Sequence, residues 1–299
     1  MPELPLQWGA EGLWQQLEPL LPGLSVEVVR STMSTNTALL DRARTVPDAG
    51  ADSGNVVVRR SAEGAAFGRR AIDLQPCLLV AEHQSAGRGR QGRVWQSATG
   101  ASLTFSLALP LAVADWSGLS LAVGVALAEA LDAAGPGHPG PHIGLKWPND
   151  LWLIDDPIGS APAGRKLGGI LIETVAAGRA RLAIIGVGLN VLPFDADGTH
   201  TGFAALRELD ASLTAPAALA RLALPLVRAL KVFEREGFAA FAERYAQRDV
   251  LCGRPVRTTH ADMPEGVASG VSPQGALLVR TAAGVESVTS GEVSVRLAP

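Results

Sequence analysis

The chain has 299 residues, of which 47% are hydrophobic and 18% are charged, and its formal net charge is -3 at pH 7. This length accommodates one large domain and a small one, and the slight acidity argues against a general binder of nucleic acids or anionic membranes. The sequence has two cysteines, Cys77 and Cys252, which excludes a disulfide framework and a cysteine metal set, so we expect two reduced thiols in a cytoplasmic protein.

The N-terminal part predicts a helix, a strand and a second helix. It lacks a basic segment followed by an apolar core, so no secretory signal is expected. The pattern favours a helix over 11–21, a strand over 25–29 and a helix over 37–44. Hydroxyl residues precede the second helix, and Ser34 or Thr35 suits its N-cap. The alternative is that these hydroxyls and the free helix amides face a polar ligand.

Residues 45–76 differ in composition from the segments on either side. They are rich in glycine, alanine, aspartate and arginine around one short apolar run at 56–58. A structureless loop of this length is uncommon inside a compact domain. We therefore predict an insertion at 45–76, after which residues 78–80 form a buried strand.

That strand leads directly into a loop rich in glycine and arginine. The loop lies within AEHQSAGRGRQGRVW, residues 81–95, and contains Gly87, Gly89, Gly92, Arg88, Arg90 and Arg93. Glycines let a backbone approach a ligand closely, and clustered guanidinium groups suit a polyanion such as a nucleotide polyphosphate. The alternative is an exposed basic loop or a weak nucleic-acid contact, because short motifs often occur by chance.

The segment that follows the loop predicts a strand and a core helix. Residues 101–109 alternate between apolar residues on one face and Thr104 and Ser106 on the other, which is typical of a half-buried strand. Residues 119–133 are apolar nearly all round, which predicts a buried helix. A proline and two acidic residues interrupt 103–131, so we expect no membrane span there.

Polar residues gather in the turn after the next strand. The strands predicted between 141 and 192 are 143–147, 151–154, 167–174 and 181–189. The first turn reads Lys146-Trp-Pro-Asn149-Asp150. Proline, asparagine and aspartate are ordinary turn residues, yet the same five residues also bring an ammonium, an indole, an amide and a carboxylate together.

Two glycine-containing segments complete this region. Lys166 precedes Gly168 and Gly169, and it is either a surface lysine at the start of a strand or a second cation of a site. GVGLN at 186–190 has two of the three glycines of a dinucleotide fingerprint, but no helix follows it, so we reject a Rossmann fold. Glycines at a strand end followed by an amide suit close approach to a flat ring.

The C-terminal part changes from helices to short strands. Residues 214–248 predict a helix that breaks near 234–237, and from 249 short valine-rich strands alternate with glycine turns. The fold class is therefore α+β, a mixed β-sheet with packed helices. We place the domains at 1–248, with the insertion at 45–76 inside it, and at 249–299.

Five motifs together carry a resemblance to a known family. They are Ser34-Thr35-Asn36, AEHQSAGRGRQGRVW at 81–95, KWPNDLW at 146–152, RKLGGILIE at 165–173 and GVGLN at 186–190. In this order they resemble the motif set of biotin protein ligases, over about residues 25–299. The resemblance implies the biotin/lipoate ligase catalytic fold and a small C-terminal SH3-like β-barrel that ends in GEVSVR.

The resemblance implies a two-step ligase reaction. Biotin and ATP, with Mg²⁺, form biotinoyl-5'-adenylate and pyrophosphate, and a specific lysine of a biotin carboxyl carrier protein then takes the biotinoyl group. The carrier belongs to acetyl-CoA carboxylase or a related biotin-dependent carboxylase. Neither DNA nor a membrane is expected as a partner, the enzyme is expected in the cytoplasm, and a homodimer is left open. Some bacterial members begin with a helix-turn-helix domain, but 33 residues before Ser34 are too few for one, so we expect a monofunctional ligase.

Family positions assign roles to individual residues. The catalytic residues are Lys166, Arg88, Arg90 and Asp150. The biotin-binding residues are Ser34, Thr35, Asn36, Gln84, Gly87, Arg88, Lys166, Gly168 and Gly169. The residues for ATP and the adenylate are Arg88, Arg90, Arg93, Trp95, Asn149, Lys166, Asn190 and Arg296. The resemblance implies that Lys166 is the main electrostatic catalyst and that Asp150 helps the acceptor lysine to lose its proton, and no residue is assigned to a metal. For Arg296, a solvated arginine at a strand end is the alternative.

Two other functions remain open. A lipoate ligase or lipoyl transferase shares the fold and the acyl-adenylate chemistry, although the full GRGRQGRVW loop is not expected there. A protein that binds nucleotides or nucleic acids without catalysis would also use the arginine loop, and the salt dependence of its binding would report the number of phosphate contacts.

Overall fold

The computed structural model describes residues 6–44, 66–67, 75–155, 164–177, 180–194, 202–259, 265–289 and 295–297. The chain forms two compact units, the first made of 1–112 and 168–228 and the second of 113–167 and 229–299. Most of the predicted insertion at 45–76 lies outside the described residues, apart from 66–67 and 75–76. The predicted domain boundary between 248 and 249 stays a prediction.

The first unit contains a mixed sheet. Its helical elements are α1 (Ala10–Leu17), α2 (Thr35–Arg44), η1 (Arg90–Gly92), η2 (Leu206–Glu208) and the first part of α4 (Ala215–Glu236). Its strands are β1 (Ser25–Thr32), β2 (Ala66–Phe67), β3 (Cys77–Gln84), β4 (Gly87–Arg88), β5 (Val94–Trp95), β6 (Ser102–Pro110), β10 (Ala180–Asn190) and most of β9 (Gly164–Ala177). The strand order is β2-β1-β3-β6-β10-β9. β1 and β3 are parallel and the other pairs are antiparallel, while β4 and β5 form a separate hairpin.

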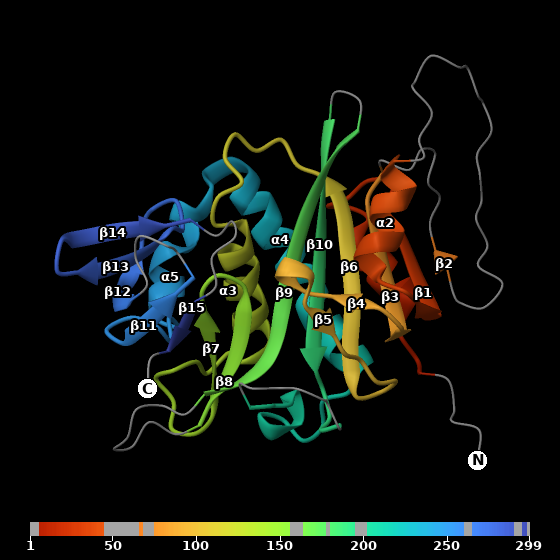
Figure 1. The fold of residues 1–299 in the computed structure, drawn as a ribbon. Coiled ribbons are helices and arrows are strands. Elements are labelled where there is room, and N and C mark those ends of the chain that lie inside the picture. The colour runs from red at the N-terminus through yellow and green to blue at the C-terminus, as the bar shows by residue number, and fades with distance from the viewer. Residues whose placement is uncertain are drawn as a thin grey trace. The chain divides into compact units, whose positions relative to one another are not determined.

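Helix α2 covers one face of this sheet and packs against β3, β6 and β10 (Figure 1). Its apolar side, Leu39, Leu40 and Ala43, joins a buried cluster with Leu79 and Ile184. These positions follow helical spacing on α2 and face the sheet, so burial of this stripe stabilises the helix far more than its own propensity does. The packing also fixes where the N-terminal end of α2 lies on the sheet.

The prediction of a half-buried strand at 101–109 is wrong, because both faces of β6 are buried. Thr104 and Ser106 are 1% and 0% exposed. The Thr104 hydroxyl donates to the Ala81 carbonyl at 2.7 Å, and Ser106 lies beneath polar residues at the start of α2. Alternation identified the two faces correctly, but a buried polar network, rather than water, covers the polar one.

Other boundaries in this unit differ by a few residues. The first helix ends at Leu17 rather than 21, since the amides of Leu20 and Leu21 both turn back to the Leu17 carbonyl. β1 continues to Thr32, beyond the predicted end at 29, because it pairs with β3 along nearly its whole length. α2 begins at Thr35, two residues earlier than predicted.

The second unit combines several helical segments, a β-hairpin and a small antiparallel sheet. Its helical elements are α3 (Leu119–Leu131), the end of α4, η3 (Phe238–Phe241) and α5 (Ala242–Ala246). Its strands are β7 (His142–Lys146), β8 (Asp150–Ile154), the first four residues of β9, β11 (Pro255–Thr258), β12 (Glu265–Val271), β13 (Leu277–Thr281), β14 (Gly284–Val288) and β15 (Val295–Leu297). The five C-terminal strands form an antiparallel sheet in the order β14-β13-β12-β11-β15. The predicted fold class, a mixed sheet with packed helices and a C-terminal SH3-like module, is confirmed.

A buried ion pair lies in the interior of this unit. Arg248 Nη1 is 2.8 Å from Asp132 Oδ2, and both side chains are 7% exposed. Arg248 also donates to the carbonyls of Ile143 and Asp132, each at 2.8 Å. Burial acts to raise the pKa of Asp132, but the amides of Ile143 and Gly135 together with the Arg248 guanidinium lower it overall. Asp132 follows α3, Ile143 lies on β7 and Arg248 follows α5, so these hydrogen bonds connect the three segments.

In the part of the chain that the structure describes, no helix has both the length and the apolar character needed to cross a membrane.

Candidate active site

A buried hydrogen-bond network lies at the start of α2 in the first unit. Gln84, at the end of β3, accepts hydrogen bonds from the Thr35 amide at 2.7 Å and from the Thr35 hydroxyl at 3.1 Å. The Ser106 and Thr35 hydroxyls are 2.6 Å apart. The Ser34 hydroxyl accepts from the Thr37 amide at 3.4 Å, so Ser34 and Gln84 together satisfy free amides of the first helical turn. Capping therefore explains part of the motif, and it leaves a hydroxyl-rich surface on the sheet.

Asn36 extends this network across the sheet. Its Oδ1 accepts from Ser106 at 2.6 Å, and its Nδ2 donates to the Leu171 carbonyl at 3.1 Å and to Glu173 Oε2 at 2.9 Å. A Cβ atom on Gly186 would lie 2.3 Å from Asn36 Oδ1. The first glycine of GVGLN is therefore needed so that this amide can lie against β10.

The glycine-arginine loop forms the hairpin of β4 and β5. Gly87 pairs with Trp95, and the tip turns sharply because Gln91 and Gly92 have φ angles of 55° and 71°. The Trp95 indole lies against Gly188, where a Cβ atom would come within 2.5 Å of the ring. Gly186 and Gly188 are two residues apart on one strand, so Asn36 and Trp95 cover the same face of β10. The chain's own indole therefore lies beside Gly188, and the approach of a ligand ring to these glycines stays a prediction.

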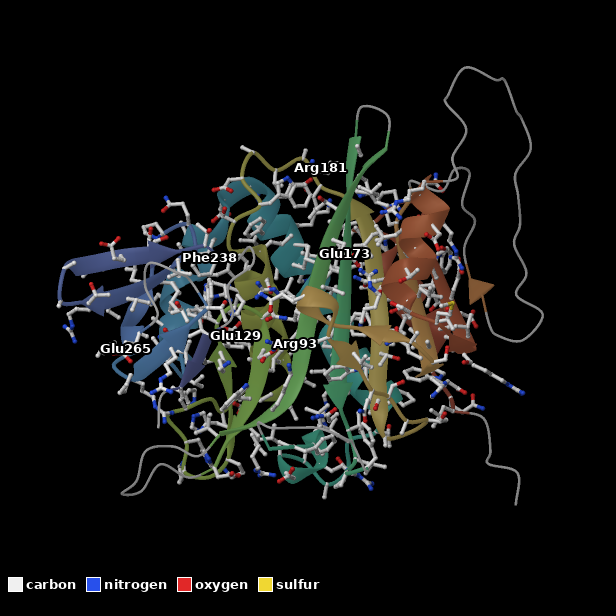
Figure 2. The ribbon with its side chains drawn as sticks, in the orientation of Figure 1. Arg93, Glu129, Glu173, Arg181, Phe238 and Glu265 are labelled. Atoms are coloured by element: carbon white, nitrogen blue, oxygen red, sulfur yellow. The ribbon has the colours of Figure 1, made fainter. Side chains whose placement is uncertain are left out.

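Arg88 of the loop makes two polar contacts with other elements. Its Nη2 lies 3.0 Å from Glu173 Oε1, and its Nη1 donates to the Thr37 hydroxyl at 3.3 Å. Its side chain is 46% exposed, so part of the guanidinium remains accessible to solvent. Arg90 lies on η1 at the tip of the hairpin and Arg93, which is exposed, precedes β5 (Figure 2).

The remaining site residues of this unit lie on β9 and β10. Gly168 and Gly169 pair with Leu189 and Gly188 across the two strands. Asn190 is 5% exposed, and its Nδ2 donates to the Ala204 carbonyl at 3.0 Å. The Asn190 amide therefore fastens the segment after β10 to the end of the strand.

In the second unit the structure brings Lys166 and Asp150 together. Lys166 Nζ is 2.7 Å from Asp150 Oδ1, and the two side chains are 31% and 18% exposed. Asn149 immediately precedes Asp150 and is partly exposed. Lys166 is two residues from Gly168 on the same strand, β9.

The first two residues of the KWPND turn bind backbone carbonyls of the C-terminal part. Lys146 is 8% exposed, and its Nζ donates to the Val295 carbonyl of β15 at 2.8 Å. The Trp147 Nε1 donates to the Gly275 carbonyl at 3.0 Å. The ammonium and the indole therefore attach the C-terminal sheet to the β7–β8 turn, while Asp150 at the other end of the turn binds Lys166. Arg296 follows Val295 on β15, and its side chain is outside the described residues.

Sequence reasoning missed Glu173, Ser106 and Thr37. Glu173 was visible as the acid at the end of the apolar run in RKLGGILIE, where alternation expects an apolar residue. The Ser106 hydroxyl was assigned to the wrong environment, because its partners are 70 and 71 residues away in sequence. Across the described ranges, no three histidine, cysteine, aspartate or glutamate side chains come together as a metal-binding group.

Two family models match the chain. The Biotin/lipoate A/B protein ligase family matches residues 73–190, and the Biotin protein ligase C terminal domain matches residues 251–296. The biotin–[acetyl-CoA-carboxylase] ligase of Mycobacterium tuberculosis is 32% identical over 300 residues, which cover 95% of this chain and 91% of that protein. The Paracoccus denitrificans protein of the same name is 30% identical, with 75% of this chain and 94% of that protein covered.

Other relatives are longer proteins. The bifunctional ligase/repressor BirA of Escherichia coli is 36% identical over 225 residues, and the match covers 73% of this chain and 66% of that protein. The chain thus spans just under two thirds of these bifunctional relatives.

Solved structures agree in fold. The biotin protein ligase from Aquifex aeolicus in complex with biotin and ATP has a TM-score of 0.67 at 23% identity, with 91% of this chain and 99% of that chain covered. From the motifs, the two family models and the relatives matched over most of their length, this chain belongs to the biotin protein ligase family.

Proposed function

We propose that this chain is an ATP-dependent ligase that joins biotin, through biotinoyl-5'-adenylate, to a specific lysine of a biotin carboxyl carrier protein. The observation that carries the proposal is the network of Thr35, Asn36, Gln84 and Ser106, which lies beside the Arg88 guanidinium. It places hydroxyl and amide groups on a buried surface next to a cation. Biotin has the matching chemistry, since a polar ureido ring is joined by an aliphatic chain to a carboxylate.

The first step requires two anions to meet, because the biotin carboxylate attacks the α-phosphate of ATP and pyrophosphate leaves. Preorganised cations lower the barrier to such a reaction. We assign this role to Arg88, Arg90, Arg93 and Lys166, with Lys166 as an electrostatic catalyst and not as a nucleophile. Asp150 holds the Lys166 ammonium at 2.7 Å, which restricts its position before the substrates bind. We propose that Mg²⁺ enters with ATP, bound to its phosphates.

Recognition of biotin and ATP is divided among the motifs. The proposed biotin-binding residues are Ser34, Thr35, Asn36, Gln84, Gly87, Arg88, Lys166, Gly168 and Gly169. For the nucleotide we propose Trp95, Asn149, Asn190 and Arg296 in addition to the cations. The Trp95 indole, which lies close enough to Gly188 to exclude a Cβ atom there, offers an aromatic surface for the adenine.

The second step transfers the biotinoyl group. The amine of the acceptor lysine attacks the carbonyl of the adenylate, a C–N bond forms, the C–O bond to phosphate breaks and AMP leaves. A free lysine has a pKa of about 10.4, so the amine must lose a proton to react at neutral pH. We propose that the Asp150 carboxylate, 18% exposed, attracts the ammonium and helps to take that proton.

The test is transfer of biotin to a purified biotin carboxyl carrier domain, followed by intact mass. With ATP and Mg²⁺ we expect a gain of one biotinoyl group, and no gain when ATP is omitted or when lipoate replaces biotin. Transfer of lipoate instead would favour the lipoate ligase alternative. Binding of biotin without any ATP-dependent release of pyrophosphate would contradict the proposed reaction.

A further inference from the structure

Glu173 occupies an unusual position on β9. Leu171 and Val175 lie two residues before and two residues after it on the strand. Alternate residues of a strand share a face, so these three side chains are on the same side of the sheet. Val175 packs against the apolar cluster beneath α2, so the face that Glu173 shares is the one that the helix covers. The Glu173 side chain is only 23% exposed. Figure 2 labels this residue. A carboxylate there costs desolvation energy that an apolar residue would avoid, so its partners must account for it.

Those partners are two of the proposed site residues. Glu173 Oε1 is 3.0 Å from Arg88 Nη2, and Oε2 accepts from Asn36 Nδ2 at 2.9 Å. Arg88 belongs to β4 and Asn36 to α2, so one carboxylate joins two segments that are distant in sequence. Each oxygen of the carboxylate thus binds one of them.

We propose that Glu173 is a positioning residue that sets the Arg88 guanidinium and the Asn36 amide in place for biotin. The inference rests on the proposed function. A guanidinium has five N–H donors in a rigid fork, and the contacts to Glu173 and Thr37 fix its orientation while leaving other donors for an anionic ligand. Because the side chains are ordered before binding, the ligand does not have to order them, and its affinity rises.

A competing role for Glu173 predicts the opposite change in biotin affinity when its charge is removed. If the carboxylate only occupied Arg88 until biotin displaced it, removing the charge would tighten binding. The second contact favours positioning, since Asn36 Nδ2 also binds the Leu171 carbonyl and needs no charged partner to remain satisfied. A simple competitor would not require an amide held on its other oxygen.

Glu173→Gln keeps the shape of the side chain but replaces one acceptor oxygen with a donor, so it loses one of the two contacts. The matched control is Glu27→Gln, which removes the charge from the 2.8 Å pair between Glu27 on β1 and Arg42 on α2, in the same unit. Biotin affinity is measured by calorimetry, and kcat and KM are measured for adenylate formation. For Glu173→Gln we expect biotin to bind roughly tenfold more weakly, as for loss of one charge-assisted hydrogen bond. The control should lose thermal stability without a change in biotin affinity.

Two further measurements separate positioning from a general effect on the fold. Biotinamide lacks the carboxylate, so its affinity should differ much less between the wild type and Glu173→Gln. In an Arg88→Met background, the second substitution should weaken biotin binding only slightly, because the two residues act as a unit. Unchanged or tighter binding of biotin by Glu173→Gln, or equal losses for biotin and biotinamide, would overturn the inference. If the wild type binds no biotin, the proposed function itself fails.

Discussion

Replacing Asp249 by asparagine should stabilise the protein at neutral and alkaline pH. Asp249 follows α5, and its Oδ1 accepts from the Leu251 amide at 2.9 Å. Its Oδ2 is buried and has no hydrogen-bond partner among the described residues. Burial raises the pKa of Asp249 from the ordinary value of 3.8 to about 6, although backbone amides act in the other direction. Asparagine keeps the acceptor for Leu251 and removes the charge.

The sign and size of the effect follow from the two pKa values. Below pH 3.8 the carboxyl is protonated in both the folded and the unfolded chain, so it contributes no pH dependence. Between that value and about 6 the unfolded chain loses its proton first, and the folded state becomes progressively less stable. Above pH 6 the full penalty applies, which is roughly 3 kcal/mol at 1.36 kcal/mol per pKa unit. We expect Asp249→Asn to recover about 1–3 kcal/mol of this at pH 8 and almost none at pH 4.

Urea unfolding of the wild type and Asp249→Asn at pH 4, 6 and 8 measures this difference. Asp115→Asn is the control, because amide and hydroxyl hydrogen bonds from Ser117 lower the pKa of that exposed carboxyl. It should not stabilise the protein at pH 8. If Asp249→Asn is no more stable than the wild type at pH 8, or gains as much at pH 4, the carboxylate is not an unfavourable buried charge and the reasoning is refuted.

Three further predictions concern the site and the core. Lys166→Ala should slow adenylate formation roughly 100-fold or more, which pyrophosphate exchange measures while circular dichroism checks folding. If the variant reacts at the parental rate, Lys166 takes no part in catalysis. Arg248→Met should lower the free energy of unfolding by about 3–5 kcal/mol, because it leaves the Asp132 carboxylate buried without its cation; urea titration tests this, and a loss below 1 kcal/mol would contradict it. Gly188→Ala puts a methyl group against the Trp95 indole and should cost roughly 1–3 kcal/mol of stability and raise KM for ATP; an unchanged KM would argue against adenine binding there.

The local elements of the fold were largely predictable. Apolar alternation and helical spacing identified β6, α3 and β10 within a few residues, because burial on one or both faces dominates their sequences. The pattern could not show whether a polar residue faces water or other protein groups. Thr104 and Ser106 alternate as if they faced water, and only the packing of α2 over β6 shows that they are buried.

The same limit applies to the site. The motifs named Thr35, Asn36 and Gln84, but the partners that join them, Ser106 and Glu173, lie 70 or more residues away from Asn36. No local pattern reports a contact over that separation. In KWPND the sequence grouped five residues as one feature, whereas adjacent side chains leave the turn in different directions.

Two bonds that attach the C-terminal sheet use side chains from the β7–β8 turn only. Lys146 and Trp147 bind carbonyl oxygens of Val295 and Gly275, and every residue carries such an oxygen. The side chains of the C-terminal strands therefore take no part in these two bonds, and they are free to change during evolution as long as the backbone keeps its path. The exception is Gly275 itself, because its φ of 80° and its closeness to Gly118 leave no room for a Cβ atom, so this one position in the C-terminal module is constrained together with Lys146 and Trp147.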